Sequence, residues 1–179
     1  MPSFKEQLDY GKCGESKIAQ YMKGRHGFSV LPVYEVLEGN YKGPRLFCKD
    51  ENLVAPDMLC MKPGKTFWIE AKHKSVFTWH RNTGCWTTGI DKHHHRDYMN
   101  VAESTGHRVW LMFLHESDEP DARDLPYCAG RKCPTGLFIC DVFEDIHHEH
   151  HGWGKHGMVY WDLSQLRKVA DVPLEVIAS

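Results

Sequence analysis

The chain has 179 residues and a formal net charge of −2 at pH 7, and 41% of its residues are hydrophobic. This length suffices for one domain with its own core, which we expect to span residues 1–179. No window contains the roughly 18 to 20 apolar residues that cross a bilayer, so we expect no membrane partner. The near-neutral charge argues against a protein that coats nucleic acid, but it is compatible with an enzyme that has one local basic groove.

The N-terminal residues carry charges with no apolar run behind them, and the seven cysteines are an odd number. Both features favour a cytoplasmic chain with free thiols and no secretory signal. Seven of the thirteen histidines lie in two clusters, within residues 93–95 and 147–151. Neither cluster is terminal, so an expression tag does not explain them.

Residues 3–6 have the form of a capping box and predict a helix over residues 3–23, which Gly24 or Gly27 can end. The positions spaced like one face of this helix are Phe4, Leu8, Gly11, Glu15, Ile18 and Met22. Because this face should turn towards the core, Glu15 is a carboxylate in a stripe that we expect to be buried.

The next segments predict strands. Residues 28–36 are rich in Val and Leu and are interpreted as a strand, and the polar residues 38–52 as a loop or a ragged hairpin. Residues 57–61 and 66–72 are interpreted as two strands, because residues 62–65 (Lys-Pro-Gly-Lys) are a strong turn signal.

The second half of the chain is less regular. Residues 74–89 receive no assignment. Asp91 is a suitable N-cap for a helix to about residue 105, with Gly106 as its stop. A short apolar strand is expected at 108–114, followed by a polar insertion at about 115–135.

Further strands are expected at 137–143 and 158–161, and Asp162 or Ser164 can begin a short last helix. The order of helix, several strands, helix and strand predicts an α/β or α+β fold, in which helices lie against a sheet.

The register of the central hairpin follows from its turn. If residues 63–64 form the tip, counting outward places Asp57 opposite Glu70, and opposed residues project from the same side of a sheet. Glu70 and Lys72 share that side, because side chains alternate along a strand. We therefore expect Asp57, Glu70 and Lys72 to cluster, unless a loop one residue longer shifts the register.

Two facing carboxylates repel each other unless a cation or a proton lies between them. The apolar residues around Asp57 and Glu70 make this repulsion stronger. A hard cation such as Mg²⁺ removes it, since Mg²⁺ takes oxygen ligands and commonly uses one or two carboxylates together with a substrate phosphate. Glu15 supplies a third carboxylate. The alternative is an ordinary solvated strand face.

At this point the residues resemble a family. The Pro56-Asp57 pair, the hairpin and the run Glu70-Ala71-Lys72 resemble the PD-(D/E)XK nuclease superfamily, which includes restriction enzymes, phage and archaeal Holliday junction resolvases and DNA repair nucleases. The upstream helix with Glu15 fits the resolvase-like or phage-type branch. The resemblance covers residues 3–114. It implies an α/β restriction-endonuclease-like fold, with a mixed β-sheet flanked by helices.

The resemblance also implies a function, namely a Mg²⁺- or Mn²⁺-dependent endonuclease that hydrolyses DNA phosphodiesters. The most specific form of this expectation is a resolvase-like enzyme that acts on branched DNA. Asp57, Glu70 and the carbonyl of Ala71 would ligate the metal, and Glu15 would complete the site directly or through water. Lys72 would orient or help deprotonate the attacking water, or stabilise charge on the phosphate. A homodimer would suit the cutting of two strands.

A later helix of this family often carries a polar residue and an aromatic residue one turn apart. His94 and Tyr98 have this spacing, so they are candidates for the catalytic site. A pair of side chains that merely pack together is an equally good interpretation.

The cysteines allow a different class of function. Cys128, Cys133, Cys140 and one of the histidines at 147–151 could hold a structural Zn²⁺, which favours four Cys and His ligands. The chain would then be a zinc-stabilised nucleic-acid-binding module without catalysis. The spacing is loose, however, and a buried free thiol is normal in an apolar run such as that around Cys140.

Overall fold

The structure is a computed structural model that describes residues 4–33, 44–49, 52–152 and 156–174 of the chain. The elements in chain order are α1 (Phe4–His26), β1 (Ser29–Pro32), β2 (Arg45–Phe47), β3 (Asn52–Val54), β4 (Met58–Lys62), β5 (Lys65–Lys74), β6 (Thr78–His80), β7 (Cys85–Asp91), α2 (Lys92–Thr105), β8 (Val109–His115), β9 (Gly136–Asp141), β10 (His148–His150), β11 (Met158–Asp162), a 3-10 turn (Leu163–Gln165) and β12 (Arg167–Ala170). Neither described α-helix is long and apolar enough to cross a membrane.

A mixed sheet of six strands lies at the centre, in the order β1–β4–β5–β8–β9–β12. Strands β5 and β8 run parallel, whereas the other neighbours run antiparallel. The two parallel strands occupy the middle of the sheet and are buried over most of their length. A strand buried on both faces needs apolar side chains on both, so the sequence of β8 is almost continuously apolar. The edge strands β1 and β12 are short and largely exposed.

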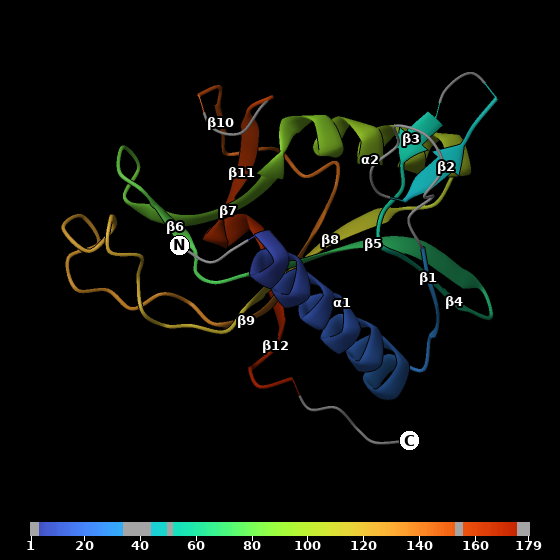
Figure 1. The fold of residues 1–179 in the computed structure, drawn as a ribbon, viewed down its shortest axis with the longest axis horizontal. Helices are drawn as coiled ribbons and strands as arrows, with labels where there is room; N and C mark the ends of the chain where they lie inside the picture. Colours follow the sequence, from blue (N-terminus) through green and yellow to red (C-terminus); the bar gives the residue numbers. More distant parts are fainter. Residues whose placement is uncertain (1–3, 34–43, 50–51, 153–155, 175–179) are drawn as a thin grey trace.

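Helix α1 covers one face of this sheet, as Figure 1 shows for the blue helix in front of β5 and β8. Its residues Ile18, Tyr21 and Met22 are buried against sheet residues that include Ile69 and Met112. The 3.6-residue spacing of the sequence therefore does mark the face of α1 that packs on the sheet.

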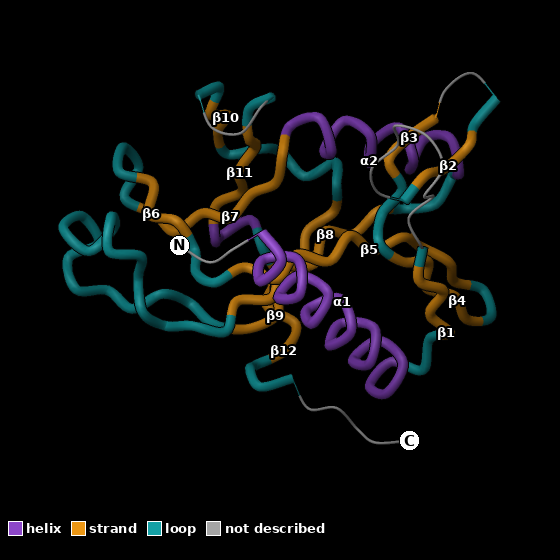
Figure 2. The backbone as a smooth tube through the Cα atoms, in the orientation of Figure 1, coloured by secondary structure: helices purple, strands orange, loops and turns teal. Residues whose placement is uncertain are grey.

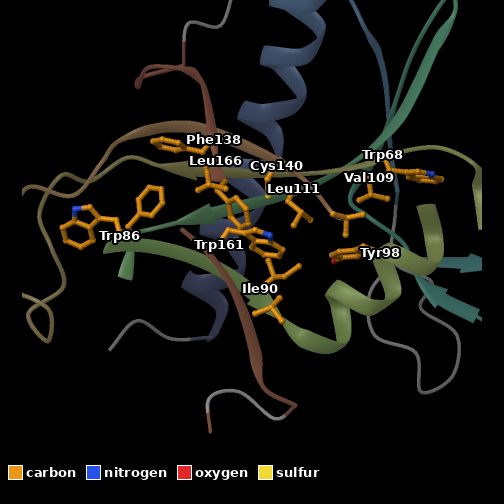
Figure 3. Packing of buried hydrophobic residues seen from close by; sticks show 14 of the residues in the cluster. Trp68, Trp86, Ile90, Tyr98, Val109, Leu111, Phe138, Cys140, Trp161 and Leu166 are labelled. Atoms are coloured by element: carbon orange, nitrogen blue, oxygen red, sulfur yellow. The ribbon is translucent and has the colours of Figure 1, made fainter. Parts of the chain in front are cut away.

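Helix α2 and a second, four-stranded sheet cover the opposite face. This sheet has the order β10–β11–β7–β6 and is antiparallel throughout. Trp161 from β11 lies fully buried at the centre of the shared core, near Leu111 of β8 and Ile90 of β7 (Figure 3). Tyr98 of α2 belongs to the same core, so this helix packs against it.

The predicted helices are confirmed with small shifts in their ends. Helix α1 continues to His26, and Gly27 ends it with a left-handed φ of +65° while its amide donates to the Lys23 carbonyl at 3.0 Å. Helix α2 has Asp91 as its N-cap residue and Gly106, at a φ of +67°, as its stop. The last predicted helix is a single 3-10 turn with Asp162 as its cap.

The strand predictions were less complete. The strand expected at 28–36 is limited to β1 among the described residues, and residues 34–36 lie outside them. Within the polar stretch 38–52, the described residues include β2, which pairs antiparallel with β3, so of the two interpretations the hairpin is the better one. The unassigned residues 74–89 form β6 and most of β7, and β12 was not predicted. Strand β7 pairs with β11 and β12 pairs with β9, both far away in the sequence, and periodicity does not reveal such pairings.

The expected polar insertion corresponds to residues 116–135, which contain no helix or strand and connect β8 to β9. Figure 2 shows this long teal segment beside β6. Asp124 anchors it there, because the buried carboxylate accepts a hydrogen bond from the Trp79 amide at 3.0 Å. Cys128 and Cys133 fill the space between this segment and the core.

Candidate active site

The register predicted for the central hairpin is confirmed. Lys62 pairs with Lys65, Leu59 with Trp68, and the turn has Gly64 at a φ of +73°, which only glycine adopts readily. Asp57 immediately precedes β4, and its Oδ2 accepts a hydrogen bond from the Ala71 amide at 2.8 Å. The hairpin therefore holds this carboxylate against the backbone of β5.

Glu70 lies in the middle of β5 and is only 1% exposed. Its Oε1 forms an ion pair with the ammonium of Lys72, two residues further along the same face of the strand. Its other oxygen, Oε2, is buried and has no hydrogen-bond partner among the described residues. A buried carboxylate oxygen without a partner is costly, so this atom is suited to receive a ligand that brings positive charge.

The charges of the site shift one another's pKa. Burial raises the pKa of the Asp57 carboxyl well above its ordinary value, and Glu70 raises it further, whereas Lys72 opposes the rise. Burial disfavours the charged form of Lys72, but the carboxylates of Glu70 and Asp57 outweigh it and raise the pKa of the ammonium. Lys72 is therefore a cation at neutral pH, held between two acids.

Glu15 approaches from α1, on the opposite side of the sheet from α2. It lines a groove of about 680 Å³ together with Asp57, and its charge contributes to raising the pKa of Asp57. The expectation that Glu15 is buried was only partly right, because its side chain is half-buried and faces this groove. Of the other described members of the stripe, Ile18 and Met22 reach the core, whereas Gly11 is half-buried.

Close contact between α1 and β5 determines where Glu15 lies. Gly14 approaches β5 so closely that a Cβ atom there would be 2.3 Å from Cβ of His73. The His73 ring stacks on Tyr10 at 3.6 Å between centroids, and its Nε2 forms a hydrogen bond with Glu116 at 2.7 Å. Lys17 also pairs with Glu116, at 2.8 Å. These contacts join the first half of α1 to the ends of β5 and β8.

Helix α2 contributes the other two candidates. Tyr98 is buried, and burial raises the pKa of its hydroxyl well above the ordinary value, with Glu70 and Asp57 adding to the rise. Its ring lies 6.0 Å from that of His94 in a stacked arrangement. Burial lowers the pKa of His94, as do the charges of His93 and Lys72. Both residues therefore lie within electrostatic reach of Glu70.

Lys74 was missed in the sequence. It follows Lys72 on the same face of β5, and burial lowers its pKa to about 8, with Lys72 contributing. The strand was expected to stop at residue 72. Extending the alternation by two residues would have placed this second lysine beside the site.

The donor set of the site fits a hard divalent cation. It consists of carboxylates, one with an unpartnered buried oxygen, and it contains no sulfur. Among the described residues, however, Glu15, Asp57 and Glu70 are not a group whose ligand atoms all lie within 4.8 Å of one another. Glu70 acts more strongly than Glu15 on the pKa of Asp57, so Asp57 and Glu70 are the more closely coupled pair of carboxylates.

The alternative zinc set of Cys128, Cys133, Cys140 and one histidine of 147–151 is not brought together among the described residues. All three are buried free thiols in the core, and they do not converge with a histidine among the described residues. Cys133 instead accepts a hydrogen bond from the Phe77 amide at 3.2 Å. Apolar packing explains these cysteines, as it does most buried thiols.

Comparison with known proteins supports the fold. No protein-family model matches the sequence, and no curated protein matches it. Among solved structures, the chain is similar to Hjc, a Holliday junction resolvase from the archaeal hyperthermophile Archaeoglobus fulgidus. The TM-score is 0.50 at 11% sequence identity, over 86% of this chain and 89% of that chain. At this identity the likeness concerns the fold alone, and it confirms the predicted class: the chain has a mixed α/β, restriction-endonuclease-like fold of the kind found in that resolvase.

Proposed function

We propose that this chain is a divalent-metal-dependent DNA endonuclease that acts on branched DNA. The observation that carries the proposal is the coupled group of Asp57, Glu70 and Lys72 on the β4–β5 hairpin, in which Lys72 pairs with Glu70 and one buried oxygen of Glu70 has no hydrogen-bond partner among the described residues. An ordinary solvated strand face would not bury Glu70 or raise the pKa of Asp57 so strongly.

Asp57 and Glu70 would hold Mg²⁺ or Mn²⁺, with the Ala71 carbonyl as a further ligand and Glu15 acting through water. When bound, the ion would polarise the scissile phosphate and lower the pKa of a bound water molecule. The indirect role of Glu15 is supported by its weaker effect on the pKa of Asp57, which Glu70 raises more strongly. The hydrogen bond from the Ala71 amide fixes the orientation of the Asp57 carboxylate before any ion arrives.

Lys72 would position the attacking water and stabilise negative charge that develops on the phosphate. Its pKa is raised, so it is a poor proton acceptor in this arrangement. Tyr98 likewise retains its proton and would orient the Glu70 carboxylate from the side of α2. His94, which lies half-buried at the rim of the same site, would contact the DNA or the leaving group.

The choice of branched DNA rests on the fold and on the resolvase activity named for the archaeal protein that shares it. Symmetric cutting of a four-way junction needs two active sites, so the proposal includes a homodimer. Local lysines near the site, such as Lys12 and Lys23 in the groove with Glu15, would contact the phosphate backbone despite the net charge of −2.

A cleavage assay tests the proposal. The substrates are a four-way junction, a flap, a linear duplex and a single strand of matched sequence, each with Mg²⁺, with Mn²⁺ and with excess chelator. We expect cleavage of the junction in either metal, little cleavage of the linear duplex and none in chelator. Activity that persists in excess chelator would rule out the metal-dependent mechanism.

A matched pair of variants distinguishes cleavage by this protein from cleavage by a contaminating nuclease. Glu70→Gln should abolish cleavage while the protein stays folded and still binds the junction. Glu103→Gln makes the same chemical change at an exposed position of α2 and should leave cleavage unchanged. Normal cleavage by folded Glu70→Gln protein would disprove the assignment of Glu70 to the active site.

A further inference from the structure

Two histidines and a cysteine converge on the second sheet, away from the carboxylates. They are His80 at the end of β6, Cys85 at the start of β7 and His147 just before β10. Among the described residues, these form a group of metal-binding side chains whose ligand atoms all lie within 4.8 Å of one another. Figure 1 shows β6 and β10 at the opposite end of the molecule from the β4 hairpin.

The backbone of the second sheet fixes this convergence. His80 and Cys85 are opposed residues of the β6–β7 pair. His147 is held by its amide, which donates to the Tyr160 carbonyl of β11 at 2.7 Å, and β11 pairs with β7. The three side chains therefore come from one connected ladder, although Cys85 and His147 are 62 residues apart in the chain.

The distances suit a tetrahedral metal. Cys85 Sγ lies 3.6 Å from His147 Nε2. Bonds of about 2.3 Å to sulfur and about 2.0 Å to nitrogen at a tetrahedral angle separate those two ligand atoms by roughly 3.5 Å. The hydroxyl of Thr83 lies between the three side chains, 2.6 Å from His80 Nδ1, 3.0 Å from Cys85 Sγ and 3.2 Å from His147 Nε2. Thr83 is in an exposed turn, so a change of χ1 would clear the point on which the three converge.

We propose that His80, Cys85 and His147 form a structural zinc site. Two imidazoles and a thiolate favour Zn²⁺ over Mg²⁺ or Ca²⁺, which take oxygen ligands. The carboxylate of Asp162 hydrogen-bonds with the Cys85 thiol, and it would supply the fourth ligand directly or through water. All three ligand residues are half-buried, so an ion can reach them from solvent.

The site would tie the β6–β7 hairpin to the segment before β10. Both are peripheral parts of the second sheet, and β6 and β10 are its two edge strands. Because zinc would bind the folded chain and not the separated strands, it should stabilise the native state. This role is independent of the carboxylate site and of DNA cleavage.

Zinc binding to the full chain tests the proposal without an activity assay. Chelator-treated protein is reloaded with Zn²⁺, desalted and measured by elemental analysis and thermal melting. We expect one zinc per chain and a rise in melting temperature on the order of 5 °C at saturating zinc. Co²⁺ in place of Zn²⁺ should give a thiolate-to-metal charge-transfer band, which reports directly on a cysteine ligand.

Cys85→Ser and His147→Ala should each remove the stoichiometric zinc, and Cys85→Ser should remove the cobalt band. Cys13→Ser and His151→Ala are matched controls at exposed positions, and both should behave like the wild type. Zinc that stays bound in Cys85→Ser but is lost in Glu70→Gln would belong to the carboxylate site and would overturn the proposal. So would wild-type protein that holds no zinc or shows no cobalt band, a result that requires no variant to fold.

Discussion

Asp57 Oδ2 accepts a hydrogen bond from the Ala71 amide at 2.8 Å, so an acid that precedes β4 is fixed to the backbone of β5. This bond favours the ionised carboxylate, but burial and the neighbouring Glu70 act more strongly and raise the pKa of Asp57. The protein thus holds two like charges together before any ion is bound. Metal binding would release that repulsion, and so would neutralising one of the acids.

Asp57→Asn should stabilise the metal-free protein and abolish cleavage. The amide keeps nearly the same shape, its oxygen can still accept from Ala71, and its nitrogen can donate towards Glu70. Releasing a like-charge pair is worth on the order of 1 kcal/mol, or roughly 2 to 4 °C in melting temperature for a domain of this size. Thermal melts without metal measure the difference between variant and wild type.

The gain in stability of the metal-free Asp57→Asn protein over the wild type should depend on pH. A carboxyl whose folded pKa is raised stabilises the folded state fully below its unfolded pKa and loses this contribution as pH rises through the folded pKa. The wild type therefore loses stability over that window and the variant does not. Equal melting temperatures at all pH values, with identical responses to Mg²⁺, would count against a clustered site.

Lys72→Met should destabilise the protein by about 1 to 3 kcal/mol, because it leaves the buried Glu70 carboxylate without its ion-pair partner. The double variant Glu70→Gln/Lys72→Met removes both charges and should recover most of that loss. Both variants should be inactive, so the double variant should recover stability without recovering cleavage. Urea unfolding checks the first effect, and a double variant no more stable than Lys72→Met would contradict the buried ion pair.

Much of the site was predictable because it depends on local rules. The turn at residues 63–64 set the hairpin register, and alternation along the strand then placed Glu70 and Lys72 on one face. Those rules act over a few residues, so one sequence is enough to apply them. Glu15 and Asp57 line one groove, but no local rule predicts this, because it depends on how α1 crosses the sheet.

The second sheet could not be predicted from the sequence, because local rules do not determine how its strands come together. Strands β6 and β10 have only three residues each, which is too short for an alternating pattern to show, and β7 pairs with β11 far along the chain. Cys85 and His80 lie in the segment that received no assignment, and the zinc alternative from the sequence rested on Cys128, Cys133 and Cys140, whose spacing is loose. Those thiols are buried because of how the chain folds in three dimensions, and their spacing in the sequence does not reveal it.

Gly14→Ala and Gly11→Ala form a matched pair on α1. A Cβ at Gly14 would meet Cβ of His73 at 2.3 Å, so α1 must move away from β5, at a cost of about 1 to 3 kcal/mol. The same movement shifts Glu15, and cleavage should fall beyond what the loss of stability explains. A Cβ at Gly11 meets nothing within 4 Å, so Gly11→Ala should stabilise the helix by up to about 1 kcal/mol. Equal effects of the two substitutions in urea unfolding would contradict the close approach.

The last prediction concerns acid sensitivity and His115 at the end of β8. The ring is fully buried, stacks on Phe77 at 3.8 Å between centroids and lies 3.2 Å from the Thr88 hydroxyl. Burial lowers its pKa to about 3, with the charges of Lys74 and His73 contributing. The unfolded chain therefore binds a proton between about pH 6.5 and pH 3 that the folded chain does not bind.

His115 consequently contributes stability that is complete above about pH 6.5 and is lost as pH falls below it. The loss should approach about 2 kcal/mol between pH 6.5 and pH 5, at 1.36 kcal/mol per pH unit. His115→Gln lowers stability at all pH values because it loses the stacking on Phe77, but it should flatten this slope. His107→Gln changes an exposed histidine and should leave the slope as in the wild type. The measurement is urea unfolding of the three proteins at several pH values, and a slope that His115→Gln leaves unchanged would show that the buried ring is not the group that takes up the proton.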